Sequence, residues 1–255
     1  MAVPDNLRLM IAAIDRDKLL RFTQFYAKFH VWTNSRIWKG ETAAQLETWK
    51  LLIKQITLVR RLSRLGKNVS YFQEAAQQLL VRKADQEDPI IRCAAIGHKL
   101  GLAGYLTYDA AVALHVLGLS RLKSLSLNRV QKRSSLWWAF SIACNITICL
   151  RSLKTLRLQA QIEKAADLAP QYQLISRKAK NLTVSGRSRK RNSYQLQVKL
   201  FALLCDMVIA LAPLEISHPS DGIIGLCGMS SSIINVWISM EQGQPGLSNH
   251  HGLTS

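Results

Sequence analysis

Six basic side chains share one side of residues 50–67 when this segment is drawn as a helix at about 100° per residue. They occupy roughly 140° of arc, and apolar side chains fill the opposite half. The basic face consists of Lys50, Lys54, Arg60, Arg61, Arg64 and Lys67, and the apolar face of Leu51, Leu52, Ile56, Leu58, Val59, Leu62 and Leu65. Such a helix can bind an anionic membrane with its apolar face among the headgroups, where it widens one leaflet. A helix docked in a bundle with a solvated basic face has the same pattern, so both interpretations stand.

Residues that could catalyse a reaction or hold a metal are few and scattered. His98, Asp109 and His115 lie across an apolar helical region without the spacing of a metal site. The sequence contains no Walker-type loop, no HExxH motif and no nucleophile elbow. Cys227 lies in an apolar run, where a thiol usually serves as a small packing residue. We therefore predict no catalytic residue, no metal site and no cofactor.

The composition combines high charge with high hydrophobicity. In 255 residues, 34 Lys and Arg stand against 16 Asp and Glu, a net charge of +18, while 48% of residues are hydrophobic. That charge indicates a phosphate-bearing partner, either nucleic acid or an anionic bilayer. No nucleic-acid motif accompanies the basic cluster at 187–191. We predict an anionic phospholipid membrane as partner and no nucleic acid. Five cysteines without a CxxC pair favour a reducing, non-secretory setting.

The elements that anchor the basic helix are expected near the C-terminus. Residues 200–214 are apolar apart from Asp206, and residues 222–240 contain no charge over nineteen positions, close to the length of a membrane span. A polar turn between them predicts a transmembrane helical hairpin with both termini in the cytosol. Asp206 needs a partner, because an ionised carboxylate is costly in lipid. We expect three glycines to allow close helix packing: Gly222, Gly225 and Gly228.

The chain as a whole is predicted to be all-α, a membrane-associated helical bundle with amphipathic helices in its N-terminal part. Helical periodicity indicates helices over 15–38, 42–65 and 70–83, and few segments have the alternation of strands. Residues 90–119 are predicted as a buried or interfacial helix pair, and 134–150 as either a short span or a buried helix. The predicted regions are an N-terminal helical region 1–89, central apolar helices 90–150, a basic helix or linker 151–195, a membrane hairpin 196–240 and a short tail 241–255.

Four segments in the same order resemble the peroxin-eleven family of peroxisomal biogenesis factors. Arg60-Arg61-Leu62-Ser63-Arg64-Leu65-Gly66-Lys67 resembles the end of that family's amphipathic helix. Residues 18–26, 101–119 and 222–231 resemble its opening helix, its central block and its C-terminal membrane segment. This chain has Ser63 where family members often carry a bulky apolar residue, and Val59 where they often carry a small polar one.

The resemblance implies a non-enzymatic integral protein of the peroxisomal membrane. The helix over 48–67 would enter the cytosolic leaflet, curve and elongate the membrane, and so promote peroxisome proliferation and fission. The family also implies a homo-oligomer, with fission adaptors and a dynamin-type GTPase as partners. A pore or metabolite-permeability protein is the alternative, with a pathway lined by polar residues of the apolar segments: Asp109, His115, Asn145, Asp206 and Asn235.

Overall fold

The computed structural model describes residues 16–38, 40–80, 88–119, 126–168, 186–216 and 218–242, and within these ranges it contains helices and no strand. The all-α prediction is therefore confirmed. The elements are α2 (Arg16–Thr33), the π-helical turn η1 (Asn34–Trp38), α3 (Ala43–Ser63), α4 (Lys67–Leu80), α5 (Pro89–Val116), α6 (Leu127–Leu168), α8 (Gly186–Leu211), the 3-10 turn η3 (Ala212–Leu214) and α9 (Asp221–Gln242).

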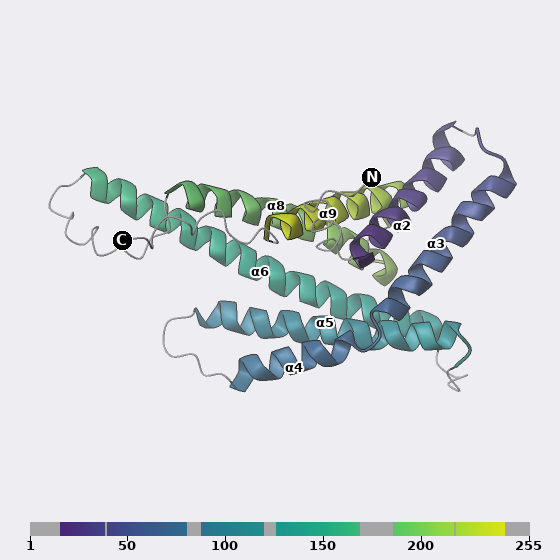
Figure 1. Cartoon of the computed structure of the whole chain (residues 1–255), viewed down its shortest axis with the longest axis horizontal. Coiled ribbons are helices and arrows are strands. Elements are labelled where there is room, and N and C mark those ends of the chain that lie inside the picture. Colours follow the sequence, from purple (N-terminus) through teal and green to yellow (C-terminus); the bar gives the residue numbers. More distant parts are fainter. Residues whose placement is uncertain are drawn as a thin grey trace, which may run out of the picture.

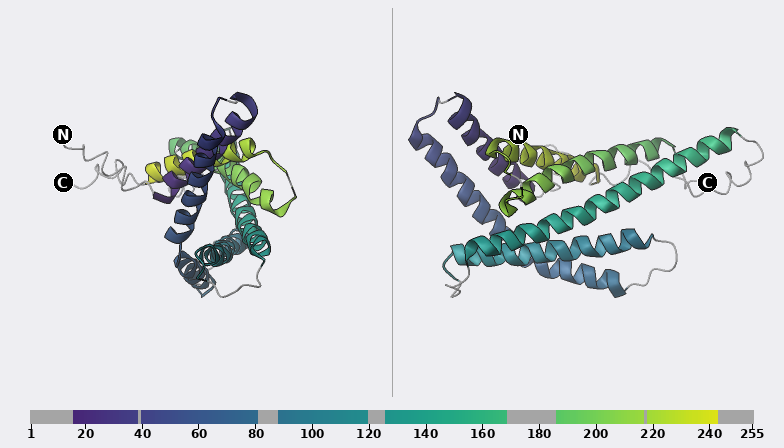
Figure 2. Two further views of the ribbon diagram at one scale, coloured as in Figure 1. Left: turned by 90° about the vertical axis from the view of Figure 1, so that its right-hand side faces the viewer. Right: turned by 180° about the vertical axis from the view of Figure 1, so that it is seen from behind.

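The long helix α6 forms the axis of the molecule (Figure 1). On one side α5 packs along α6, and α4 packs on α5. On the other side α8 packs on α6, α9 packs on α8, and α2 packs on α9. Helix α3 runs across between these two groups, and it contacts α2 on one side and α5 on the other (Figure 2). Its rotation is therefore set by contacts with two separate parts of the fold.

Three helices are long and apolar enough to cross a membrane, judged by length and composition: Leu127–Ile162, Arg191–Leu214 and Asp221–Glu241. The last two are the predicted C-terminal hairpin, with the turn near Glu215, which adopts a left-handed conformation (φ 59°). The first of these helices contains the predicted segment 134–150. That segment is not a separate short helix but part of the 42-residue helix α6. Likewise the pair predicted over 90–119 is the single helix α5.

Local sequence signals explain the bounds of α3. Thr42 accepts a hydrogen bond from the backbone of Gln45, whose side chain accepts one from the backbone of Thr42, and this capping box starts the helix. After Ser63 the chain turns at Gly66, whose φ of +85° favours glycine, and α4 begins at Lys67. The amphipathic segment 48–67 therefore ends in a turn, and Lys67 belongs to the next helix.

Glycines bring α2 and α9 into close contact. A Cβ atom on Gly225 would lie 2.8 Å from Cβ of Phe29 and 2.9 Å from its backbone nitrogen. The three glycines of this row face aromatic residues of α2: Gly222 faces Trp32, Gly225 faces Phe29 and Gly228 faces Phe25. The two antiparallel helices approach closely because these positions lack side chains.

A second glycine row joins α5 to α6. A Cβ atom on Gly101 would lie 2.9 Å from the Cα atom of Ser141. Its neighbours in the row, Gly97 and Gly104, face Cys144 and Trp137. Glycines therefore let α5 pack closely against α6, as they let α2 pack against α9.

Candidate functional site

The arginines of α3 point into the molecule. Arg60 is only 9% exposed. Its Nε donates to Oδ1 of Asp17 on α2 at 2.9 Å, and its Nη1 donates to Oε1 of Gln24 at 2.6 Å. Gln24 in turn donates to Oγ1 of Thr57 at 2.7 Å, which returns the network to α3. These bonds fix the side of α3 that faces α2.

Two further arginines share one carboxylate on α5. Nε of Arg61 lies 2.9 Å from Oδ1 of Asp109, and Nη2 of Arg64 lies 2.9 Å from Oδ2 of the same residue. Nη1 of Arg64 also donates to the hydroxyl of Tyr105 at 3.0 Å. Asp109 is 5% exposed. A buried carboxylate that binds two guanidinium groups holds α3 against α5 and limits its rotation.

Two groups of this network, Asp17 and Arg64, are ionised at neutral pH. Burial disfavours the ionised form of Asp17, but the hydrogen bond and charge of Arg60 outweigh it, and the pKa of Asp17 lies below its usual value. Burial likewise disfavours the charged form of Arg64, yet Tyr105 and Asp109 raise the pKa of Arg64 above its usual value. For both Asp17 and Arg64 the neighbouring groups therefore outweigh the cost of burying the charge.

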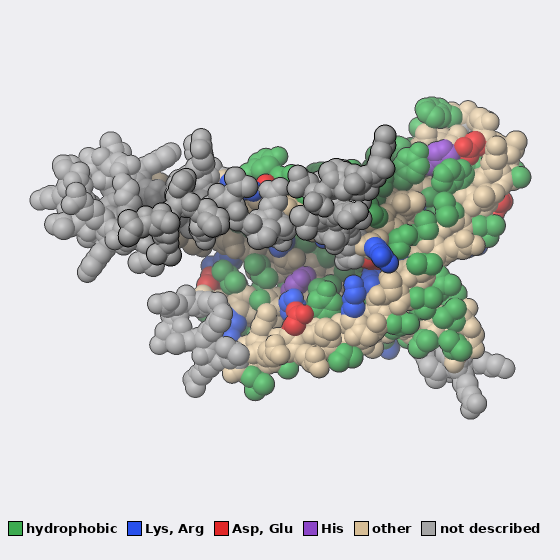
Figure 3. All heavy atoms as spheres, in the orientation of Figure 1, with side chains coloured by type: hydrophobic (Ala, Val, Ile, Leu, Met, Phe, Trp, Pro, Cys, Tyr) green, Lys and Arg blue, Asp and Glu red, His purple; other side chains and the backbone are tan. Residues whose placement is uncertain are grey.

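The apolar side of α3 points outward. Leu51 is 55% exposed and Val59 is 50% exposed, while Leu65, in the turn that follows, is 41% exposed. Leu52, Leu58 and Leu62 are partly exposed, and Ile56 is the member of the predicted apolar face that is buried. On the face shown in Figure 3, hydrophobic side chains gather over α3. Near Arg60 the helix therefore differs from a helix of a soluble bundle, because its arginines face inward while part of its apolar side is exposed.

This orientation corrects the prediction for half of the basic face. Arg60, Arg61 and Arg64 were predicted to face headgroups or water, and instead they face inward because Asp17 and Asp109 bind them. The lysines of the predicted face remain accessible. Lys50, Lys54 and Lys67 are exposed, and Nζ of Lys50 lies 2.7 Å from Oε1 of Glu47.

Sequence reasoning did not identify the acidic partners of these arginines. Asp17 is 43 residues away from Arg60, and Asp109 is 48 and 45 residues away from its two arginines, so no local spacing indicates these contacts. Asp206 is a similar case, since Nη2 of Arg21 on α2 donates to its Oδ1 and also to Oγ of Ser231 at 3.1 Å. The partner that the carboxylate of Asp206 needs in an apolar helix is thus on α2.

An exposed apolar row on α4 was also missed. It consists of Val69, Phe72, Leu79 and Leu80, which are 54%, 46%, 58% and 82% exposed. Along the sequence these residues recur at intervals of three or four positions when Ala76 is counted between Phe72 and the two leucines. That interval places them on one side of a helix, and it is the signal that could have identified them. The outward apolar surface is therefore not confined to α3.

Two of the residues that the sequence offered as possible metal ligands have partners within the protein. Asp109 binds two arginines, and Nδ1 of His98 lies 2.8 Å from Oγ of Ser141. No group of three His, Cys, Asp or Glu side chains that could hold a metal ion occurs among the described residues.

Replacing Asp17 with asparagine should weaken the contact between α2 and α3 by about 1.5–3 kcal/mol at neutral pH, because a charge-assisted hydrogen bond to Arg60 is lost. The pKa of Asp17 is lowered in the folded chain, so its contribution is complete above its usual pKa of 3.8 and disappears as the pH falls through the lower, folded value. Melting temperatures measured from pH 6 to pH 2 should show the two proteins converging below pH 4. A constant difference over that range would contradict this assignment.

Comparisons with known proteins agree with the resemblance. The model of the family described as Peroxisomal biogenesis factor 11 (PEX11) matches residues 8–239. The chain is 22% identical over 236 residues to peroxisomal membrane protein PMP27 of Saccharomyces cerevisiae, an alignment that covers 90% of this chain and 91% of that protein. It is also 22% identical over 241 residues to peroxisomal membrane protein PMP30A of Candida boidinii, with the same coverage. No solved structure matches the chain. Since the family model spans nearly all of the helices described above, this chain belongs to the peroxisomal biogenesis factor 11 family.

Proposed function

We propose that this protein is a non-enzymatic component of the peroxisomal membrane that curves and elongates the membrane and thereby promotes peroxisome proliferation and fission. Helices α6, α8 and α9 anchor it, and the apolar side of α3 enters the cytosolic leaflet as a wedge. The observation that carries the proposal is the outward apolar face of α3, with Leu51 and Val59 at least half exposed. The family and the names of its two relatives support the choice of organelle.

The inward arginines give the wedge its orientation. Because Asp17 and Asp109 hold the three arginines inside the protein, the helix presents leucine and valine to the bilayer without arginine side chains between them. Lys50 and Lys54 are exposed beside this face and can reach lipid phosphates, each contributing about 1 kcal/mol near an anionic surface. In this proposal apolar insertion deforms the leaflet, and the lysines add a weaker attraction that salt can screen.

Self-association of several copies would concentrate such wedges in one patch of membrane. We propose a homo-oligomer for this reason, with fission adaptors and a dynamin-type GTPase as later partners in division. These partners would act on membrane that the wedges have already elongated.

Replacing Leu51 and Val59 together with aspartate should abolish the deformation of liposomes. An ionised carboxylate in hydrocarbon costs about 2.5–3.5 kcal/mol even on mild insertion scales, so neither position could enter the leaflet. The full chain, reconstituted at equal protein density in liposomes that contain anionic lipid, should form about tenfold fewer tubules than the unmodified chain. Electron microscopy of the vesicles provides the count.

A charge-matched control is available on the same helix. Lys50→Gln combined with Lys54→Gln also lowers the net charge by two but leaves the apolar face intact, and it should retain most of the tubules at high salt. If the lysine variant lost tubules as completely as the aspartate variant, attraction to headgroups rather than insertion would explain the deformation, and the wedge would be refuted.

A further inference from the structure

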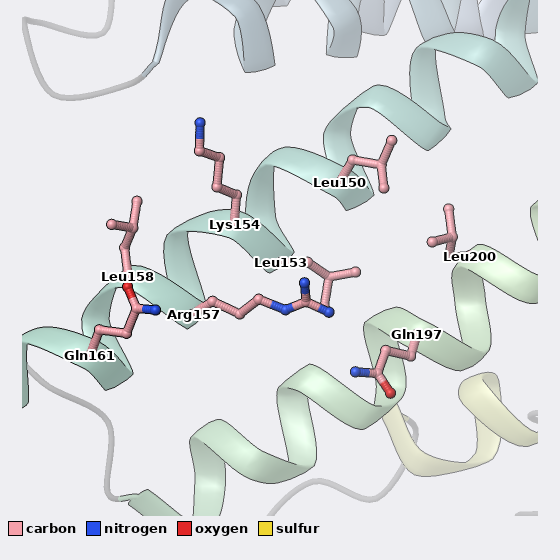
Figure 4. Close-up of a pocket in the computed structure, with 8 residues that line it drawn as sticks. All are labelled: Leu150, Leu153, Lys154, Arg157, Leu158, Gln161, Gln197 and Leu200. Atoms are coloured by element: carbon pink, nitrogen blue, oxygen red, sulfur yellow. The ribbon is translucent and has the colours of Figure 1, made fainter. Parts of the chain in front are cut away.

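A pocket of about 460 Å³ lies between α6 and α8 (Figure 4). Its α6 wall is one face of the helix, from Leu150 through Arg157 to Gln161, and α8 contributes Gln197 and Leu200. Its volume is within the range of about 300–1,000 Å³ that is typical of sites for small molecules. Nothing in the function proposed above uses this pocket.

The pocket is apolar at one end, and its polar side chains lie in the middle and at the other end. Leu150 and Leu200 lie at the apolar end, and Gln161 lies at the opposite end beside the exposed side chain of Leu158. Between them the guanidinium group of Arg157 extends into the space between the helices, opposite Gln197 of α8 (Figure 4). Among the residues that the structure describes, no acidic side chain lines the pocket. A fitting ligand therefore has an anionic group attached to an apolar body.

The fold leaves the positive charges of the pocket available. Two other arginines of these helices bind carboxylates. Nη1 of Arg151 lies 3.6 Å from Oδ2 of Asp88, and Nη2 of Arg191 lies 3.1 Å from Oε1 of Glu241. By contrast, no carboxylate of the described residues lies within 4 Å of Lys154 or Arg157, and both side chains are exposed. Lys154 lies at the rim and points away from α8, and its flexible stem can follow a ligand.

The position of the pocket along the two helices selects the ligand. Both helices are long and apolar enough to cross a membrane. The uncharged run 134–150 of α6 ends where the pocket begins, and the apolar run of α8 starts near residue 200, at the same end of the pocket. When α6 and α8 cross the bilayer, the polar end lies at headgroup level and the leucines point toward the hydrocarbon.

We infer that this pocket binds the headgroup of an anionic phospholipid from the adjoining leaflet. Arg157 and Lys154 contact the phosphate, the glutamines bond to its oxygens or to the glycerol, and the leucines pack against the first methylenes of the acyl chains. A free phosphate monoester has the same charged group without the apolar body. The phospholipid therefore gains binding energy from contacts with the leucines of the pocket, and the free phosphate monoester does not.

The test uses the full chain in a neutral detergent, with bound molecules counted by native mass spectrometry. The probes are dioleoyl phosphatidic acid, dioleoyl phosphatidylcholine and glycerol 3-phosphate. Replacing Lys154 and Arg157 with glutamine should weaken the apparent affinity for phosphatidic acid about tenfold or more, because the two cations that line the pocket are lost. The unmodified chain should bind glycerol 3-phosphate at least about tenfold more weakly than phosphatidic acid.

The matched control removes two other exposed cations of α6, with Arg129→Gln and Arg133→Gln, and should change this affinity less than about twofold. Equal losses in the two variants, or no loss in the pocket variant, would overturn the lipid site. Equal affinity for glycerol 3-phosphate would show a site for free phosphate instead. The insertion of α3 is tested by counting vesicle tubules, whereas the pocket is tested by counting bound lipid molecules. Either proposal can therefore fail without affecting the test of the other.

Discussion

Replacing Asp109 with asparagine is expected to detach α3 from α5 at a cost of about 3–5 kcal/mol, since it leaves two partly buried guanidinium groups without their shared counter-charge. Arg61 and Arg64 cannot deprotonate to relieve that cost. Unfolding of the purified chain in detergent should begin at lower temperature. Spin labels on exposed positions of α3 and α5, such as Gln55 and Leu114, should report a broader distribution of distances.

Two control variants separate the charge from the local packing. Tyr105→Phe removes one hydrogen bond to Arg64 and should cost about 1 kcal/mol. Adding Arg61→Met and Arg64→Met to the Asp109→Asn chain removes the uncompensated charges and should restore much of the stability. An asparagine variant with unchanged melting and unchanged label distances would show that the shared carboxylate does not hold α3 in place.

The second large effect is expected at the contact between α2 and α9. Replacing Gly225 with leucine should force the helices apart, because a Cβ atom there already meets the backbone of Phe29 and cannot be accommodated by a side-chain rotation. Overpacking of this kind typically costs about 1–3 kcal/mol. Separation would also disturb the bond from Arg21 to Asp206, which adds the cost of a less well paired carboxylate.

Crosslinking can follow this separation directly. A cysteine pair at Lys18 and Ser239, which are hydrogen-bonded to each other, should crosslink in the unmodified chain and lose most of its yield in the Gly225→Leu chain. The matched control is Leu226→Phe, which adds bulk on a half-exposed position of the same helix and should leave the yield unchanged. Undiminished crosslinking in the leucine variant would contradict the close approach at this glycine.

Local signals in the sequence were sufficient for the elements but not for their orientation. The capping box at Thr42 and the positive φ of Gly66 are encoded within a few residues, and the predicted helix 42–65 agrees closely with α3. The side that α3 turns inward depends on carboxylates more than 40 residues away. Periodicity measures how apolar and basic residues separate around a helix, and it contains no information about which side meets the rest of the fold.

The membrane segments illustrate the same distinction. Hydropathy identified the hairpin of α8 and α9 because a span needs a long, predominantly apolar run. It underestimated α6, since the helix continues beyond Leu150 through Arg151, Lys154 and Arg157. Lysine and arginine favour helix formation nearly as well as leucine, so the end of an apolar run is not the end of a helix. The partner of Asp206 could not be predicted from any local pattern.

The length of α6 has a mechanical consequence. At 1.5 Å per residue its 42 residues span about 63 Å, twice the hydrocarbon thickness of about 30 Å. If the uncharged run 134–150 crosses the bilayer, the 18 residues from Arg151 to Leu168 project about 27 Å from one surface. Each copy then carries a projecting helical segment on one side of the membrane. Steric pressure between crowded copies would act on that surface alone, and it would bend the membrane in the direction that relieves the crowding.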